Sequence, residues 1–416
     1  MGQGLHVFND AVSRMDKGSQ ELPLEVANPS TSLKWNAEAV LEAWSLSSFP
    51  RSSRTWLQRT LIQDQKELTF EILLQLEHAL YTREKRKGEG IAYTPLAIAT
   101  LLVEQALSAM KSSGYEQTKS IRILDPACGT GIFLFALCNH FLQSSPFASS
   151  SHIENFIAQS LFALERDPVA LEISKILVTS FLMSQRSQLS SKALFSICDK
   201  NFRHGNFLLA PNHASSSRFF DAIDLHHSCG KSSFDLIIGN PPYGLSRDGG
   251  ISKQELAVLK ARYGSRLKAK PNKYLLFVFR ALELLSQRGV VHFILPNSWL
   301  GIDSGRSLRR FLLEENFLDQ LTLFPRSIFP ELGVETCAVL LRRSISRDCL
   351  RVVMNKREHT VQNSQILKHP SRAIPVLWSD QVSKVLDKIE SSSFRLESER
   401  TPFSVRIAIQ VYGLGK

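Results

Sequence analysis

The stretch Ile123-Leu124-Asp125-Pro126-Ala127-Cys128-Gly129-Thr130-Gly131 joins a short apolar run to a glycine-rich turn. The run over 121–125 predicts a buried strand, and the glycines predict a tight turn that leads into a helix. Glycines at such a turn let the backbone approach a ligand and open the N-terminus of the helix toward it. The full Gly-x-Gly-x-x-Gly pattern is absent, which disfavours a dinucleotide. Any α/β protein needs glycine at such a turn, so this motif alone leaves the function open.

Strands and helices are predicted to alternate along the chain from about residue 95 onward. Short apolar runs bounded by Gly, Pro, Asp or Asn predict strands at 121–125, 161–165, 194–198, 234–239, 290–295, 320–324 and 336–341. Helical patterns lie between most of them, at 168–183, 273–287 and 304–315. This alternation predicts an α/β domain with a mostly parallel sheet. The last two strands are expected to pair antiparallel, because the eleven residues that join them are too few for a parallel crossover.

The chain is basic, and its excess charge lies in two segments. Its 416 residues include 50 Lys and Arg against 39 Asp and Glu, a formal net charge of +11. Residues 247–273 hold eight basic and two acidic side chains, and residues 342–357 hold six basic and one acidic. The excess suggests a polyanionic partner, nucleic acid first, although a basic run is also common on a solvated face.

Composition narrows the class of protein further. The sequence is 43% hydrophobic and 21% charged, as in a globular protein rather than a disordered one, and it has no apolar run long enough to span a membrane. The six cysteines are scattered, with no Cys-x-x-Cys pair. A zinc site or a disulfide framework is therefore not expected, and a reducing cytoplasm is the expected location.

An acidic residue, Glu165, ends the predicted strand 161–165. An acid at the end of the second strand of a nucleotide-binding sheet commonly accepts from ribose hydroxyls. The 40 residues between Asp125 and Glu165 exceed the usual spacing of about 20, and a Ser-rich insertion at 143–152 fills the difference. Taken alone, Glu165 is equally well interpreted as a surface carboxylate.

The most specific motif is Asp235-Leu236-Ile237-Ile238-Gly239-Asn240-Pro241-Pro242-Tyr243. A buried strand here delivers an amide, two prolines and an aromatic ring at its C-terminal end, where open α/β sheets bind ligands. The prolines lack N–H groups, so carbonyls face the site. Asn240 Oδ1 and a neighbouring carbonyl can then both accept from one exocyclic amino group, while Tyr243 offers a flat face to a planar ring. Two acceptors on an aryl amine favour a tetrahedral nitrogen and so free its lone pair for attack.

Together these motifs resemble the S-adenosylmethionine-dependent N6-adenine DNA methyltransferases of the gamma class, particularly those of restriction–modification systems, over about residues 83–345. The resemblance implies a Rossmann-like methyltransferase fold with a mostly parallel seven-stranded sheet and an antiparallel last strand. It also implies S-adenosylmethionine as cofactor and direct methyl transfer to the N6 of an adenine flipped out of duplex DNA, with no metal. Cytosine C5 methylation is excluded because its Pro-Cys nucleophile is missing.

The resemblance assigns roles to individual residues. The catalytic segment is Asn240, Pro241, Pro242 and Tyr243. The residues implied in cofactor binding are Tyr93, Thr94 and Pro95, then Asp125, Pro126, Ala127, Cys128, Gly129, Thr130 and Gly131, and the ribose-binding acid Glu165. Phe329 matches the aromatic that packs on the flipped base. Apart from the resemblance, the basic run 247–273 makes Lys268, Lys270 and Lys273 candidates for contacts with DNA phosphates. The family usually has Asp before Phe at the adenosyl pocket, where this chain has Asn206 and Phe207. Asn206 Oδ1 can still accept from the cofactor's amino group, and Phe207 can still stack.

The resemblance also predicts the domain organisation. We expect a helical N-terminal region at 1–88, a catalytic domain at 89–345, and at 346–416 a linker with the start of a target-recognition region. Residues 405–416 resemble the opening of that region, so we expect a truncated gene product or one half of a split enzyme. The expected partners are double-stranded DNA and a separate specificity subunit or C-terminal half. Alternatives stay open: the same fold acting on cytosine N4, rRNA guanine N2 or protein glutamine, or a non-catalytic DNA-binding remnant.

Overall fold

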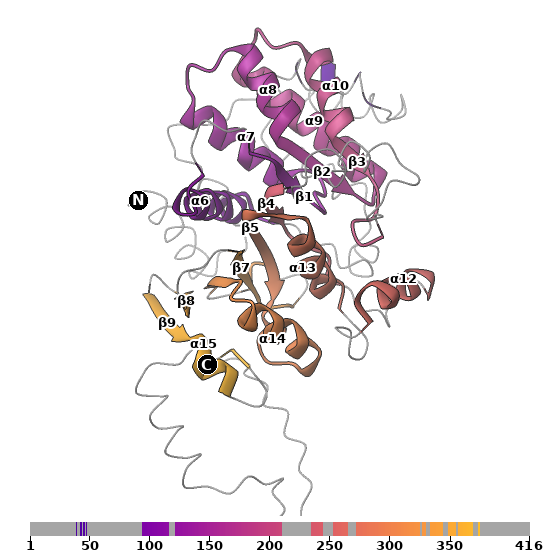
Figure 1. Ribbon diagram of the computed structural model, residues 1–416. Helices are drawn as coiled ribbons and strands as arrows, with labels where there is room; N and C mark the ends of the chain where they lie inside the picture. The colour runs from indigo at the N-terminus through magenta and orange to yellow at the C-terminus, as the bar shows by residue number, and fades with distance from the viewer. Residues whose placement is uncertain are drawn as a thin grey trace, which may run out of the picture.

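The computed structural model describes residues 39, 42, 43, 45, 47, 94–115, 121–209, 234–243, 253–264, 272–324, 327–329, 333–343, 348–354, 357–368 and 373–374. These residues form an α/β fold around one sheet with the strand order β3-β2-β1-β4-β5-β7-β6-β8-β9 (Figure 1). Apart from a few isolated positions, the helical region expected at 1–88 lies outside the described residues. Within them, no helix is long and apolar enough to cross a membrane.

The first five strands of the sheet run parallel. They are β1 (Ile123–Asp125), β2 (Leu161–Glu165), β3 (Phe202–His204), β4 (Phe234–Gly239) and β5 (Leu285–Pro296). Strand β7 (Thr336–Arg342) is antiparallel both to β5 and to β6 (Leu318–Leu323). The predicted mostly parallel sheet is confirmed, and so is the antiparallel pairing expected between 320–324 and 336–341.

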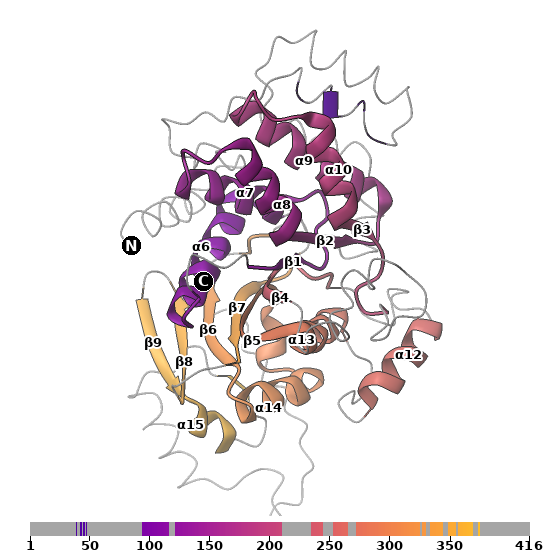
Figure 2. The ribbon, with the colours of Figure 1, turned by 45° about the horizontal axis from the view of Figure 1, so that its top comes forward.

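The sheet continues beyond the boundary expected at residue 345. Strand β8 (Cys349–Met354) pairs parallel with β6, and β9 (Arg357–Gln362) pairs antiparallel with β8. Figure 2 shows this hairpin at the edge of the sheet opposite β3. In β8, Leu350 and Val352 are fully buried on either side of Arg351, the two-residue alternation of a strand, but this short run lies within the basic segment 342–357 and was not predicted as a strand. Both the seven-strand prediction and the assignment of this segment to a linker were therefore wrong.

The strand predicted at 194–198 is also wrong, because these residues lie inside helix α10 (Ser191–Asn201). The Ser190 hydroxyl accepts from the Ala193 N–H at 3.3 Å and caps the helix. Leu194 and Cys198, four residues apart and both fully buried, lie on one face of that helix. The third strand is β3, which follows α10 directly.

Helices cover both faces of the sheet. One face carries α6 (Leu96–Ser112), α7 (Ile132–Ser144), α8 (Ser150–Ser160), α9 (Pro168–Gln185) and α10; the other carries α12 (Lys253–Tyr263), α13 (Lys273–Leu284) and α14 (Arg306–Glu314). A short helix, α15 (Asn363–Lys368), follows β9.

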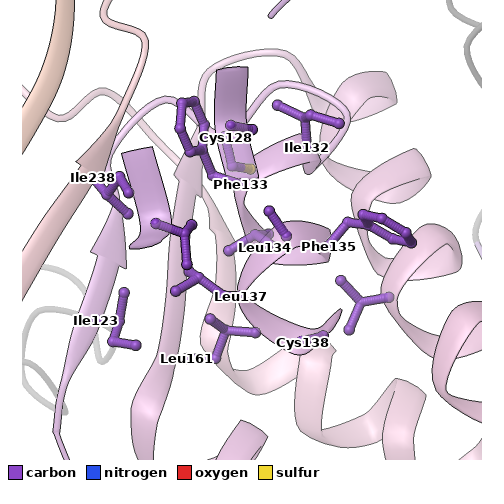
Figure 3. Close-up of a cluster of buried hydrophobic side chains, with 14 of the residues drawn as sticks. Ile123, Cys128, Ile132, Phe133, Leu134, Phe135, Leu137, Cys138, Leu161 and Ile238 are labelled. Atoms are coloured by element: carbon purple, nitrogen blue, oxygen red, sulfur yellow. The ribbon is translucent and has the colours of Figure 1, made fainter. Parts of the chain in front are cut away.

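A hydrophobic core lies on each face of the sheet, and successive residues of a strand point alternately into one core and the other. Ile123 of β1 packs with α7 (Figure 3), whereas Leu124 belongs to the core on the α13 side. This alternation is the expected consequence of the two-residue repeat of a strand that is buried on both faces. Packing on both faces therefore sets the positions of the residues that follow the strands.

Candidate active site

The carboxyl ends of β1, β2, β3 and β4 meet at one edge of the sheet, because these strands are adjacent and parallel. The residues at or just after these ends are Asp125, Glu165, Asn206 and Asn240. These are the residues that the sequence singled out as candidates, and the fold brings them to the same edge, where open α/β sheets bind ligands.

The glycine turn after β1 depends on backbone conformations that favour glycine. Gly129 and Gly131 have φ values of +53° and +96°. A Cβ on Gly131 would lie 2.9 Å from Ser174 Cβ, so this turn packs directly against α9. The Cys128 N–H donates to the Leu164 carbonyl at 3.1 Å, which ties the turn to β2. Helix α7 begins at Ile132, so its N-terminus faces the same edge of the sheet.

Asp125 is fully buried where β1 ends. Its Oδ1 accepts from the Ala127 N–H at 3.2 Å, while its Oδ2 is buried without a hydrogen-bond partner among the described residues. Burial raises the pKa of the Asp125 carboxyl well above its ordinary value, and the nearby charge of Glu165 raises it further. A buried acceptor of this kind is suited to a ligand that brings a donor or a positive charge.

Glu165 holds the glycine turn through its side chain. Oε2 accepts from the Gly129 N–H at 2.8 Å, and Oε1 accepts from the N–H groups of Arg166 and Asp167 at 2.7 and 2.9 Å. Burial raises the pKa of Glu165 and outweighs these three hydrogen bonds, which lower it. The carboxylate thus links the ends of β1 and β2 as well as ending the second strand.

Asn240 follows β4 next to Asp125. A Cβ on Gly239 would lie 2.7 Å from Asp125 Oδ1, so only glycine lets the two strand ends approach this closely. Asn240 Nδ2 donates to Thr94 Oγ1 at 3.1 Å, and Asn240 Oδ1 accepts from the Tyr243 hydroxyl at 2.5 Å. Both polar atoms of the amide therefore have buried or half-buried partners.

Aromatic rings surround Tyr243. The Tyr274 ring meets it edge-on with centroids 6.4 Å apart, and the Phe329 ring lies 6.1 Å away at 64°. Burial raises the pKa of the Tyr243 hydroxyl, which keeps it protonated as the donor to Asn240. Pro241 is buried and Pro242 is half-buried beside it. Phe329, a residue that the sequence singled out, therefore lies next to the Asn240–Tyr243 segment.

Asn206 and Phe207, which follow β3, have partners within the protein. Asn206 Oδ1 accepts from the Leu208 N–H at 3.0 Å. Phe207 is only 2% exposed, and its ring packs on Phe277 of α13 with centroids 5.1 Å apart. Their roles toward an adenosyl group stay predictions, and Phe207 would contact such a group from within the core on the α13 side.

The basic residues differ from what their sequence clusters suggested. Lys273 starts α13 and is only 9% exposed, which disfavours a phosphate contact of the kind expected for an exposed lysine. In the 342–357 segment, Arg342 is buried and pairs with Asp319 at 3.0 Å, Arg343 donates to the Leu282 carbonyl, and Arg351 donates to Gln320. These internal partners disfavour, for the three arginines, the contact with a polyanion that the charge excess suggested. Tyr93, Lys268 and Lys270 lie outside the described part of the chain.

Sequence reasoning missed a polar chain behind Tyr243. Asn272 Nδ2 donates to the Tyr274 hydroxyl at 3.1 Å, and the Tyr274 hydroxyl also hydrogen-bonds the Ser298 side chain. Asn272 and Tyr274 at the start of α13 were the available signal, but nothing in the sequence placed them next to Tyr243.

The α/β fold with a mostly parallel sheet that the sequence predicted is confirmed. The chain superposes on the Type ISP restriction-modification enzyme LlaGI, a nuclease-deletion mutant in complex with a DNA substrate mimic, with a TM-score of 0.54 and 15% identity. The superposition covers 91% of this chain and 37% of that one. At this identity the likeness concerns the fold alone.

Sequence comparison gives the more particular relationship. The family model of the Eco57I restriction-modification methylase matches residues 159–329, a range that includes Glu165, Asn240–Tyr243 and Phe329. The Type II restriction enzyme and methyltransferase RM.Eco57I of Escherichia coli is 22% identical over 286 residues, 63% of this chain and 28% of that protein. The Type II methyltransferase M.BanIII of Aneurinibacillus aneurinilyticus is 28% identical over 231 residues, 55% of this chain and 34% of that protein. The chain is thus similar to methyltransferases of restriction–modification type, and the match spans about a third or less of the length of these relatives.

Proposed function

We propose that this chain transfers a methyl group from S-adenosylmethionine to the N6 amino group of a flipped-out adenine in double-stranded DNA, within a restriction–modification or related DNA-modification system. The observation that carries the proposal is the position of Asn240-Pro241-Pro242-Tyr243, which follows β4 directly beside the Asp125–Gly131 turn. An acceptor for an amine and a ligand-binding turn thus share one edge of the sheet.

The residues present fit S-adenosylmethionine. The buried, unpartnered Asp125 Oδ2 offers an acceptor, the glycine turn at the start of α7 permits close backbone approach, and Glu165 supplies a carboxylate between the two strand ends. The proposed cofactor set further includes Tyr93, Thr94, Pro95, Asn206 and Phe207. When bound, the sulfonium supplies an electrophilic methyl group; the protein's part is to bind and orient.

The target amine would be held by Asn240 and the segment after it. Its two hydrogens would be donated to Asn240 Oδ1 and to the Pro241 carbonyl, which favours a tetrahedral nitrogen with an available lone pair. The amine thereby takes the place of the Tyr243 hydroxyl on Oδ1. Tyr243 and Phe329 supply aromatic surface for the base ring, which must leave the base stack before its N6 is accessible.

DNA is preferred over the other amine substrates for two reasons. The segment that follows Tyr243, residues 247–272, holds seven basic and two acidic side chains, a net charge of +5 even without the buried Lys273, which favours a phosphate backbone. The relatives are methyltransferases of restriction–modification type. Because these relatives extend well beyond the matched part, we also propose that a specificity subunit or a C-terminal half supplies the contacts to base edges that sequence recognition needs.

The proposal predicts the effect of Asn240→Ala. Removal of the amine acceptor should lower the rate of methyl transfer by about 10²–10³-fold, as for other preorganised hydrogen-bonding groups. Binding of S-adenosylmethionine should persist, since the cofactor residues remain. Single-turnover transfer of tritiated methyl to DNA, with isothermal titration of the cofactor, measures both quantities.

The matched control is Gln143→Ala, which removes an exposed amide from α7. It should leave both the rate and the affinity as in the unmodified protein. If Asn240→Ala transfers methyl groups as fast as this control, the assignment of Asn240 is wrong.

A further inference from the structure

The turn that follows β3 is held from two sides. At its start, the Gly205 N–H donates to the Glu165 carbonyl at 2.9 Å, which ties the turn to the end of β2. At its end, the Leu208 carbonyl accepts from Arg262 Nη1 of α12 at 3.0 Å, across 54 residues of sequence. The first hold comes from the sheet, whereas the second comes from a helix in the basic segment that follows Tyr243.

Helix α12 is packed so that Arg262 can make this contact. Leu259 and Tyr263, one helical turn apart, are only 1% and 2% exposed and belong to the core on the α13 side. Lys260 lies on the exposed side of the helix, which Figure 1 shows beyond α13 at the periphery of the fold. Arg262 follows Leu259 by three residues and therefore lies at the edge of the packed face, from which its guanidinium reaches the Leu208 carbonyl.

Leu208 in turn orients the Asn206 amide. The Leu208 N–H donates to Asn206 Oδ1 at 3.0 Å. A backbone N–H can only donate, so this bond determines which end of the amide is turned toward it. The amide oxygen has two lone pairs, and Oδ1 can accept a second hydrogen bond from an amino group. The orientation of Asn206 thus depends on the position of Leu208, which Arg262 holds through its carbonyl.

We propose that Arg262 is a positioning residue of the cofactor site, which acts through Leu208 to hold Asn206 Oδ1 where it accepts from the 6-amino group of the adenosyl moiety. This inference rests on the proposed function and deepens it. It assigns part of the selectivity for the cofactor to α12, a helix that contains none of the cofactor motifs.

The test measures how well the protein distinguishes S-adenosylhomocysteine from S-inosylhomocysteine, whose base carries an oxygen in place of the 6-amino group. That oxygen cannot donate to Asn206 Oδ1, so the unmodified protein should bind the adenosyl compound about 10- to 100-fold more tightly. Arg262→Met keeps an apolar stem for packing but has no donor, and it should lower this ratio of dissociation constants by about 10-fold. Arg262→Lys keeps a charged donor and should restore part of the ratio. Isothermal titration of each ligand gives the dissociation constants.

Two controls separate positioning from other effects. Lys260→Met removes the same charge from an exposed position of the same helix and should leave the ratio as in the unmodified protein. Asn206→Ala should abolish the preference, and Arg262→Met added to it should then change the ratio no further, because the amide that Arg262 positions is gone.

Three results would overturn the inference while leaving the proposed function intact. They are an unchanged ratio in Arg262→Met, an equal loss of affinity for both ligands in that variant, and an unmodified protein that binds the two ligands equally well. The equal loss would indicate a general change of structure rather than a misplaced Asn206. The proposed function fails separately, if the unmodified protein transfers no methyl group to DNA.

Discussion

At the scale of single residues, two neighbouring carboxylates, Glu165 and Asp167, differ in the contacts that they make. Glu165 accepts from three backbone N–H groups and contacts the glycine turn. Asp167 Oδ1 accepts from the N–H groups of Val169 and Ala170 at 2.8 and 3.3 Å, which caps helix α9. Only the first of these side chains belongs to the cofactor site that we propose.

Replacement of each carboxylate should therefore have a different effect. Glu165→Ala removes a charged acceptor from the proposed cofactor site, and we expect the affinity for S-adenosylmethionine to fall by about 10- to 100-fold. Asp167→Ala removes a helix cap and should lower the free energy of unfolding by about 1 kcal/mol, with no change in that affinity. Isothermal titration and urea unfolding measure the two effects. Equal losses of affinity in both variants would contradict a specific role of Glu165 in the proposed cofactor site.

The individual site residues were predictable where they lie in a local motif. Asn240, Tyr243, Asp125 and Glu165 each follow an apolar run, and adjacent parallel strands bring such positions together. The bond from Asn240 to Thr94 was not predictable, because it depends on how α6 packs across the sheet. The burial of Lys273 was missed for a similar reason: a lysine in a basic run looks solvated until its helix is placed.

At the scale of elements, the turn between β1 and α7 contains two glycines with different constraints. Gly131 has φ +96° and would bring a Cβ to within 2.9 Å of Ser174 Cβ, whereas Gly129 has φ +53° and open space around it. The first position combines an unfavourable backbone conformation with a steric clash, and the second has only the conformation. The packing of the turn on α9 thus depends on Gly131 in particular.

This difference predicts unequal losses of stability. Gly129→Ala should lower the free energy of unfolding by about 1–2 kcal/mol, the cost of a left-handed residue. Gly131→Ala should lower it by about 2–5 kcal/mol, because overpacking against Ser174 adds to that cost. Urea unfolding of the two variants measures the difference, and equal values would contradict the described packing of the turn.

Element type was predictable except where two signals compete. The apolar run at 194–198 has the length of a strand, yet Ser190 caps a helix there and Leu194 and Cys198 face one core. In β8 the opposite occurred: Leu350, Arg351 and Val352 alternate as in a strand, but the segment was interpreted from its charge, and the Arg351 guanidinium donates to Gln320 of the neighbouring β6. Both errors arose because contacts with residues distant in sequence determine whether such a segment forms a helix or a strand.

At the scale of the whole molecule, the net charge predicts contacts with DNA less well than the positions of the charged side chains do. The +11 excess suggested two DNA-facing segments, but three arginines of the second one, Arg342, Arg343 and Arg351, bond to groups within the fold. Arg342 pairs with Asp319 at only 1% exposure of the acid side chain. Positive charge for a DNA backbone is therefore better sought in the segment after Tyr243 than in the bulk excess.

The central claim is tested most directly by the chemical identity of the product. The protein and S-adenosylmethionine with a tritiated methyl group are incubated in three parallel reactions, with double-stranded DNA, with RNA and with a protein substrate. The labelled DNA is then digested to nucleosides. The account predicts label in DNA alone, recovered as N6-methyldeoxyadenosine and lost with Asn240→Ala. Label recovered as N4-methyldeoxycytidine, or found in RNA or protein instead of DNA, would contradict it.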